Sequence, residues 1–329
     1  METIDIRDIA GFRVGQEQDL QAATGCTVII SEKGAVCGVD VRGGSPGTRD
    51  TDALDPINNR KHVHAVLLSG GSSFGLDAAG GVMRFLEERG IGRDVEVGKV
   101  PNVCAAILFD LKCGASHIRP DASMGYAACE NAFQGGAFQS GNYGAGTGAT
   151  VGKARGSRYA MKGGIGAAAF RYGSLEAGAI VAVNCVGDVV KNGATIAGTL
   201  TDDRRGFANS ERIILENYRS DRDFFSGGPD SPGSETSGNT VLGCIITNAA
   251  FDKAGAARLA GQGQNAIARL VRPAHSIFDG DTVFALCSGV VETTIDAAGI
   301  LCAAAMEAAI IDAVQSARTL GGYTAAGDL

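Results

Sequence analysis

The stretch "ETSGNTVLGCIITNA", residues 235–249, joins two kinds of sequence without a transition. A polar segment with glycine ends at Gly238, and an apolar, β-branched run begins directly after Asn239 and Thr240. A short apolar run bounded by turn residues is typical of a buried strand. The stretch therefore predicts a loose connection that stops at the Asn239–Thr240 bond, with a rigid strand behind it.

Thr240 has two interpretations at this boundary. A β-branched residue commonly begins a strand, and the local sequence by itself favours that plain interpretation. Alternatively, cleavage after Asn239 would give Thr240 a free α-amine, and an ordinary pKa of ~7.7–8.0 leaves much of such an amine neutral. An N-terminal threonine uses its amine as the base for its own hydroxyl. Before cleavage, the same hydroxyl can attack the preceding carbonyl.

Strand and helix patterns are mixed along the whole chain, which predicts an α/β layered fold. Residues 25–41 predict two strands around a turn at SEKG, and the apolar run at 105–111 is expected to be buried. The remaining predicted elements are strands at 64–68, 163–170, 177–183, 241–247 and 282–286, and helices at 76–90, 122–133, 252–270 and 293–317. Residues 240–329 are too few and too apolar to stand alone, so residues 1–329 are expected to form a single domain.

The segment before the quoted stretch has a different composition. Residues 202–238 are first charged and then rich in serine, glycine and proline, as in FFSGGPDSPGSETSG. Such a composition predicts a loop or linker.

Composition excludes several classes of function. The 329 residues carry a formal net charge of −7, which argues against binding to nucleic acid or to an anionic membrane surface. No uninterrupted apolar stretch reaches about 18 residues, so we expect no membrane span. The nine cysteines include no CxxC pair and lie mostly in apolar runs, as expected of buried thiols in a reducing compartment. We therefore expect a cytoplasmic protein.

Two glycine-rich segments invite a search for a phosphate or nucleophile site. In GAGTGATVGKARG, residues 144–156, the spacing before Lys153 does not match a phosphate-binding loop. Lys153 is then either an exposed lysine on a turn or a cation brought close to a site. In LSGGSSFGLD, residues 68–77, Ser72 and Ser73 lack the spacing of a nucleophile elbow. They are expected to cap a helix or to contact substrate, and the free N–H groups of that helix start can face a carboxylate.

The stretch HSIFDGDTVFAL, residues 275–286, places Asp279 and Asp281 two residues apart just before a strand. Together with His275 they are metal-ligand types, but no further ligand is visible. Asp-Gly-Asp is also a common turn sequence. The third interpretation is a carboxylate pair that orients an ammonium or a hydroxyl group.

Five segments together resemble the motif set of the DmpA-type L-aminopeptidase/D-esterase family of self-processing N-terminal-nucleophile hydrolases. They are GNTVLGCIITNA, RPAHSIFDGDTVFAL, GAGTGATVGKARG, LSGGSSFGLDAAGGVMRFLEE and AIVAVNCVGDV. The resemblance covers residues 11–317. Asn-Thr at the cut and Asp-Gly-Asp later in the chain are most similar to the nylon-oligomer (6-aminohexanoate-oligomer) endo-hydrolases, whereas the better-known aminopeptidase members have serine at the cut.

The resemblance implies a four-layer αββα sandwich with no metal or organic cofactor, assembled as a homo-oligomer of four or more chains. It implies cleavage between Asn239 and Thr240 into residues 1–239 and 240–329, with Thr240 as the nucleophile. Lys153, Asn184, Asp279 and Asp281 match further active-site positions of the family. Lys153 is expected to keep the Thr240 amine neutral, Asn184 to donate to the oxyanion, and the aspartates to hold the amine and relay its proton.

One position departs from the family pattern. Phe109 stands before Asp110 where some relatives have a tyrosine. The phenyl ring can contact substrate but offers no hydroxyl to the substrate or the oxyanion, so the match to the nylon-oligomer hydrolases is weaker at this position. The sequence predicts an amide hydrolase acting on small peptides or ω-amino-acid oligomers. The alternatives are an aminopeptidase of the β-peptidyl type and an uncut binding protein without catalysis.

Overall fold

The structure is a computed structural model that describes residues 1–217 and 238–329. Most of the predicted linker at 202–238 lies outside these residues. Its described part holds one short helix, α3 (Ser210–Glu216), and Gly238.

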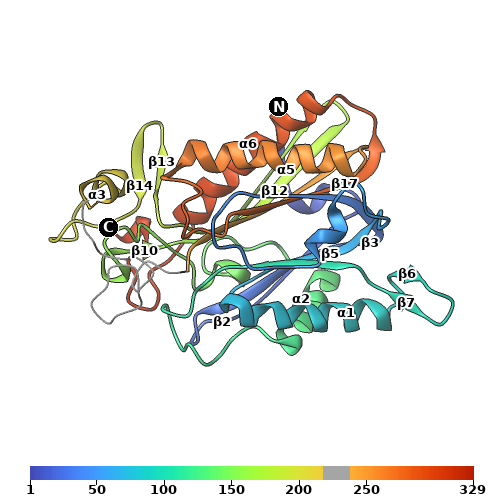
Figure 1. Ribbon diagram of the computed structural model, residues 1–329, viewed down its shortest axis with the longest axis horizontal. Helices are drawn as coiled ribbons and strands as arrows, with labels where there is room; N and C mark the ends of the chain where they lie inside the picture. Colours follow the sequence, from blue (N-terminus) through green and yellow to red (C-terminus); the bar gives the residue numbers. More distant parts are fainter. Residues whose placement is uncertain (218–237) are drawn as a thin grey trace.

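Four layers build the molecule, as Figure 1 shows. Helices α5 (Lys253–Leu270) and α6 (Ile295–Gln315) cover one side, and α1 (Ala78–Glu88) and α2 (Ala122–Gln134) cover the other. Two sheets lie between the helix layers. The αββα sandwich implied by the family resemblance is therefore confirmed.

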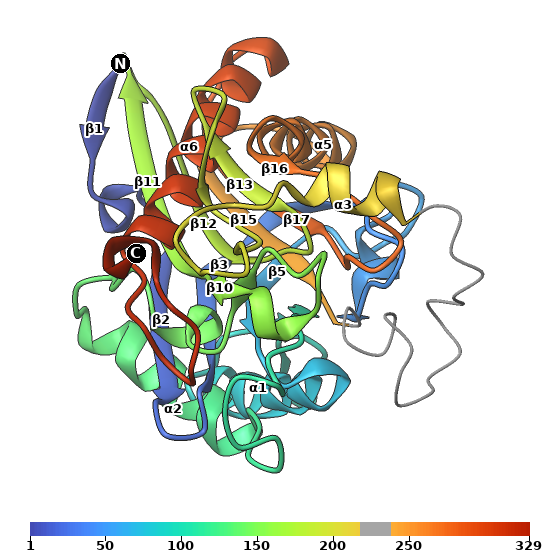
Figure 2. The same ribbon diagram turned by 90° about the vertical axis from the view of Figure 1, so that its left-hand side faces the viewer.

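The first sheet lies under α5 and α6 and has the strand order β1-β11-β12-β15-β17-β3. Strand β15 pairs antiparallel with β12 and parallel with β17, so it lies at the centre, and Figure 2 shows β1 beside β11 at one edge. The predicted strands 163–170, 177–183, 241–247 and 282–286 are all found here, each somewhat longer than predicted. The bounds are β1 (Glu2–Ile4), β11 (Gly164–Tyr172), β12 (Leu175–Asn184), β15 (Thr240–Ala249) and β17 (Thr282–Val291).

The prediction of two strands around a turn at SEKG is wrong. Residues Thr24–Val41 form one strand of 18 residues, β3. Its first half pairs with β2 and β5, and its second half pairs with β17. A hairpin would pair the two halves with each other, whereas here each half pairs with a different sheet and the strand joins them.

The second sheet continues from β3 through β5, β8 and β4, with β2 on its other side. The predicted helix at 76–90 begins as a 3-10 turn over Ser72–Asp77 and becomes α-helical as α1 at Ala78. The sheet's own strands are β2 (Arg13–Asp19), β4 (Thr48–Arg49), β5 (Val63–Ser69) and β8 (Val103–Ile107). Two smaller sheets have two strands each: β6 (Arg93–Asp94) with β7 (Lys99–Val100), and β9 (Thr150–Val151) with β10 (Met161–Lys162). A third has three strands, with β13 (Asp188–Lys191) between β14 (Ala194–Ala197) and β16 (Val271–Arg272).

Three apolar clusters fill the spaces between the four layers. In β15, Val241 and Ile245 pack toward α5 and α6, whereas Leu242 and Cys244 pack between the two sheets. Alternate residues of a strand point to opposite faces, so β15 is apolar on both sides. This explains why its sequence is a continuous apolar run.

All nine cysteines are buried and unpaired, as the apolar runs predicted. One helix of the described residues, α6, is long and apolar enough to cross a membrane by length and composition. It packs on β11, β12 and α5, and 56% of its most apolar window is buried, as in the core helix of a globular fold.

Candidate active site

Thr240 is the first residue of β15 and lies in register with Asn184, the last residue of β12. Both side chains fall on the strand face that carries Leu242 and Cys244, which is the face between the two sheets. Both residues are buried. The end of β12 and the beginning of β15 therefore bring together two residues that are 56 positions apart in the sequence, next to the space between the two sheets.

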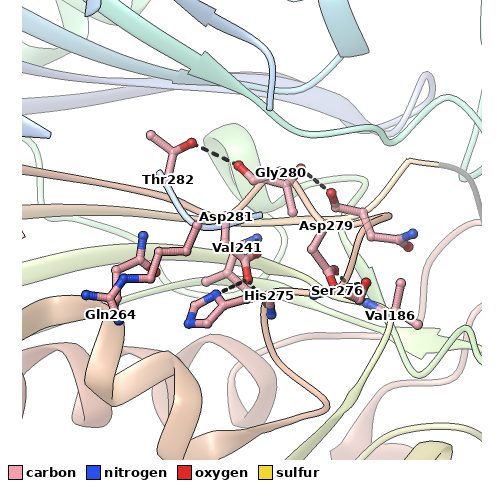
Figure 3. Close-up of polar contacts among 12 residues, drawn as sticks. Val186, Val241, Gln264, His275, Ser276, Asp279, Gly280, Asp281 and Thr282 are labelled. Carbon is pink, nitrogen blue, oxygen red and sulfur yellow. Dashed lines mark hydrogen bonds and ion pairs between the residues drawn. The ribbon is translucent and has the colours of Figure 1, made fainter. Parts of the chain in front are cut away.

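The carbonyl oxygen of Asn239 is held from two sides. The hydroxyl of Thr240 donates to it, and so does the backbone N–H of Gly280, at 2.8 Å. Residue 239 also forms a parallel bridge with Asp279, which continues the β15–β17 pairing. Figure 3 shows Gly280 between Asp279 and Asp281. The Asn239–Thr240 bond, which is expected to be cut, is therefore held in place at the beginning of β15, the central strand of the first sheet.

The Asn184 amide connects four parts of the site. Its Nδ2 donates to the carbonyl oxygens of Phe109 (3.0 Å) and Gly238 (3.3 Å). Its Oδ1 accepts from the Thr150 N–H at 2.9 Å and from Lys153 Nζ at 2.9 Å. Asn184, Thr150 and Lys153 are buried, whereas Phe109 and Gly238 are partly exposed.

Lys153 is buried, with 4% of its surface exposed, so the interpretation as an exposed lysine on a turn is wrong. Its Nζ donates to the backbone oxygen and to Oδ1 of Asn184, each at 2.9 Å. Burial lowers the pKa of Lys153 from 10.5 to about 7, and the negative charge of Asp279 partly opposes this shift. The residue therefore titrates in the physiological range.

Asp279 and Asp281 brace the two strand ends that carry the site. Asp279 accepts from the Val186 N–H, two residues beyond Asn184, at 3.1 Å, and from the hydroxyl and N–H of Ser276. Burial and the neighbouring charge of Asp281 raise the pKa of Asp279.

Asp281 accepts from the Val241 N–H, directly after Thr240, at 2.7 Å. Its other oxygen contacts His275, whose Nδ1 lies 2.8 Å away. Figure 3 shows this contact beside Val241. Within the described residues, no hydrogen bond joins either carboxylate to the Thr240 hydroxyl. Nor do the described residues contain a group of three or more side chains that could hold a metal ion.

The Phe109 ring lies against Gly238, the residue before Asn239. A Cβ added to Gly238, which has φ +91°, would lie only 2.1 Å from Cγ of the Phe109 ring. A hollow of about 10 Å³ opens beside it, with Lys153, Cys113 and Tyr323 among its lining residues. That volume is about the room for one water molecule.

Neither Ser72 nor Ser73 lines this hollow, and neither caps a helix. The backbone N–H of Gly71 instead donates to the carboxylate of Asp110 at 2.7 Å. The expected carboxylate at that turn therefore comes from the chain itself. Asp110 also accepts from the Thr24 hydroxyl, and burial raises its pKa to about 6. Substrate contact by the two serines remains a prediction.

Several residues of the site were not predicted from the sequence. Thr150, Ser276 and the N–H of Gly280 bond directly to Asn184, Asp279 and the Asn239 carbonyl. His275, a metal-ligand type by its sequence context, instead binds Asp281. Thr150 and Ser276 lie within or beside the motifs already noted, and this proximity is the only sequence signal they give.

Comparison with known proteins identifies the family of the chain. The model of peptidase family S58 matches residues 5–326. The chain belongs to this family. An uncharacterized aminopeptidase of Mycobacterium leprae is 41% identical over 311 residues, which cover 89% of this chain and 80% of the relative. A 6-aminohexanoate-oligomer endohydrolase of Paenarthrobacter ureafaciens is 30% identical over 279 residues, covering 85% and 73%.

Solved structures agree with the S58 fold. The L-aminopeptidase D-Ala-esterase/amidase of Ochrobactrum anthropi superposes with a TM-score of 0.69 at 18% identity, over 95% of this chain and 86% of that one. A β-aminopeptidase of a Burkholderia species gives 0.64 at 20% identity, over 97% and 88%. The resemblance inferred from the motifs is confirmed, and the chain is a hydrolase of amide bonds.

Proposed function

We propose that this S58 hydrolase matures by cutting its own chain between Asn239 and Thr240, which leaves fragments 1–239 and 240–329. Thr240 then acts as an N-terminal nucleophile on small peptides or ω-amino-acid oligomers. The observation that carries the proposal is the contact between the Thr240 hydroxyl and the Asn239 carbonyl, held at the end of the central strand. A residue that only began a strand would need no such contact.

The neighbouring side chains suit the turnover step. After the cut, the free amine of Thr240 takes the proton of its own hydroxyl. Departure of residue 238 releases one of the two acceptors of Asn184 Nδ2, which then donates to the substrate oxyanion. Lys153 lies on the other side of the same amide, and its positive charge favours the neutral amine. The aspartates position the two strand ends.

An aminopeptidase that trims N-terminal residues is the second candidate. One observation favours it over the nylon-oligomer reaction. The relative named as an aminopeptidase is more similar, at 41% identity against 30% for the endohydrolase. Rates on amino-acid amides, β-peptides and aminohexanoate oligomers distinguish the two.

The cut itself is tested by intact mass and denaturing gel electrophoresis. We expect wild-type protein to give two fragments divided after Asn239. Thr240→Ala should remain intact and inactive, because no hydroxyl is left to attack either carbonyl. Thr240→Ser should still be cut, since serine keeps the hydroxyl, and should turn over at an altered rate. Cleavage and amide turnover by Thr240→Ala would rule out the nucleophile, and an intact wild-type chain would favour an uncut binding protein.

A further inference from the structure

We infer that the backbone N–H of Gly280 is the oxyanion donor of self-cleavage, and that Asn184 serves the oxyanion only in turnover. The inference rests on the proposed cleavage after Asn239. The inference assigns one oxyanion donor to self-cleavage and another to amide hydrolysis, although the Thr240 hydroxyl is the nucleophile in both reactions.

The uncut chain holds Gly280 and Asn184 differently. The Gly280 N–H donates to the Asn239 oxygen at 2.8 Å, and this is the oxygen that becomes negative when the carbonyl is attacked. The Asn184 amide group donates instead to the oxygens of Phe109 and Gly238. Before the cut, therefore, Asn184 Nδ2 is occupied by other acceptors, whereas the Gly280 N–H is already in place.

A second observation concerns the side chain that residue 280 lacks. A Cβ at this position would lie 2.8 Å from the Thr240 hydroxyl oxygen and 2.7 Å from the backbone oxygen of Ser45. Glycine thus lets the backbone approach the nucleophile closely. The aspartates on either side anchor this segment through Val186 and Val241, so the N–H is fixed before reaction. Such preorganisation is what makes an oxyanion donor effective.

The step conserves atoms and charge as follows. The Thr240 oxygen bonds to the Asn239 carbonyl carbon, the carbonyl electron pair moves to its oxygen, and the hydroxyl proton passes to a water molecule. The electron pair on the oxyanion then re-forms the carbonyl as the C–N bond breaks, and the nitrogen keeps the electron pair of that bond and takes up the proton that the water had accepted. A second water hydrolyses the resulting ester, which leaves a carboxylate on Asn239 and the free amine and hydroxyl of Thr240.

Turnover places the oxyanion elsewhere. The Asn239 carbon is bonded to the Thr240 nitrogen, so its oxygen lies where the peptide plane directs it. A substrate carbonyl has no such bond and approaches the hydroxyl from the space that the departing residues leave. That space borders Asn184 through its released Gly238 contact. The two oxyanions therefore need different donors.

A side-chain substitution cannot test a backbone N–H, and Gly280→Ala would also displace the nucleophile. We therefore propose to replace Gly280 with glycolic acid by nonsense suppression in cell-free translation, which changes N–H to an ester oxygen and adds no atom. Cleavage is followed on gels after synthesis is stopped. We expect self-cleavage to slow roughly 100-fold, the low end of the effect of losing one oxyanion donor. Once mature, this protein should hydrolyse amides with a normal kcat/KM.

Two matched esters control the result. The first replaces Gly322, whose N–H donates no hydrogen bond within the described residues. The second replaces Ser45 with the matching hydroxy acid, because the ester at 280 also weakens the Asp279 carbonyl, which accepts from the Ser45 N–H at 2.9 Å. Both should be cut at the wild-type rate.

The outcomes are distinct. Normal cleavage of the ester at 280 would overturn the role of Gly280 while leaving the proposed function intact. Equal slowing by either control ester would also overturn it, since the effect would then be general. If the ester at 280 slowed both self-cleavage and amide hydrolysis by the mature enzyme to the same extent, the Gly280 N–H would serve both reactions, which would contradict the assignment of separate donors. A wild-type chain that is never cut would remove the proposed function and this role with it.

Discussion

Lys153 shows how a single residue acquires its chemistry from burial. The sequence places a lysine on a glycine-rich turn, where an ordinary pKa of 10.5 is expected. In the fold its amine lies out of water against Asn184, and the pKa falls to about 7. A lysine in this state exchanges its proton near neutral pH, so its charge becomes part of the pH dependence of the site.

We expect Lys153→Met to slow amide hydrolysis by a factor that corresponds to ~2.7–4 kcal/mol of lost transition-state stabilisation, the usual effect of removing one electrostatic contact from an active site. The acid limb of the kcat/KM profile should also move to higher pH. Removing a nearby positive charge stabilises the protonated form of the Thr240 amine, so the pKa of that amine rises. Steady-state rates from pH 5 to 9 test both effects. The matched control is Lys191→Met, which replaces an exposed lysine. Near-normal turnover by a folded Lys153→Met protein would return this residue to a purely structural role.

The end of β8 and the beginning of β15 meet across the inter-sheet space. Phe109 follows β8, and its ring packs against Gly238, the last residue before the Asn239–Thr240 pair. Its carbonyl also accepts from Asn184, which is paired with Thr240. Phe109, two residues beyond β8 of the second sheet, thus packs beside the Asn239–Thr240 bond at the start of β15, and this contact exists because the two sheets stack.

We expect Gly238→Ala to slow self-cleavage markedly, because a Cβ there would lie 2.1 Å from the Phe109 ring and would push the scissile bond away from Gly280. The matched control is Gly322→Ala. Gly322 has a similar positive φ of +85° but open space around it, so this change carries the backbone strain without the collision. Time courses of fragment formation on gels compare the two. Equal rates in both variants would show that the Phe109 contact does not position the bond.

Buried titratable groups make the stability of the whole molecule depend on pH in two opposing ways. Burial lowers the pKa of Lys153 to about 7 and that of Lys162 to about 8, whereas both keep their protons to 10.5 when unfolded. Between these values the unfolded chain binds more protons, so stability rises with pH. Burial raises the pKa of the nine thiols above 9.0. Above pH 9 the unfolded chain therefore binds fewer protons, and stability falls.

We predict that, within the range from pH 7 to pH 11, the free energy of unfolding is greatest between pH 8 and 9 and falls steeply above pH 9. Each proton of difference contributes up to about 1.4 kcal/mol per pH unit. Urea unfolding of the uncut Thr240→Ala protein, under reducing conditions, measures the curve. Lys153→Met in the same background should reduce the rise between pH 7.5 and 8.5, because one of the two lysines is gone. A wild-type curve without a rise in this window would show that the buried lysines keep their protons.

The sequence by itself determined the elements that are continuous in the chain and the motifs that lie within them. The apolar run after Asn239 gave β15, and the long helical patterns gave α5 and α6 within a few residues. Motif resemblance gave the family and named the residues that meet at the end of β15. These features depend on side-chain periodicity and local spacing, which one sequence displays directly.

Only the tertiary structure decided which residues share a hydrogen bond. Whether β3 turned back or crossed between sheets depended on the strands beside it, and residues 31–34 alone do not distinguish the two. Asn184 bonds to residues 31 and 75 positions away, and the Gly280 N–H reaches a carbonyl 41 positions earlier. A backbone N–H has no letter in the sequence, and burial, which lowers the pKa of Lys153, is a property of packed neighbours. The sequence could name these residues, but only the packing of the four layers determined what they bind and in which state of charge.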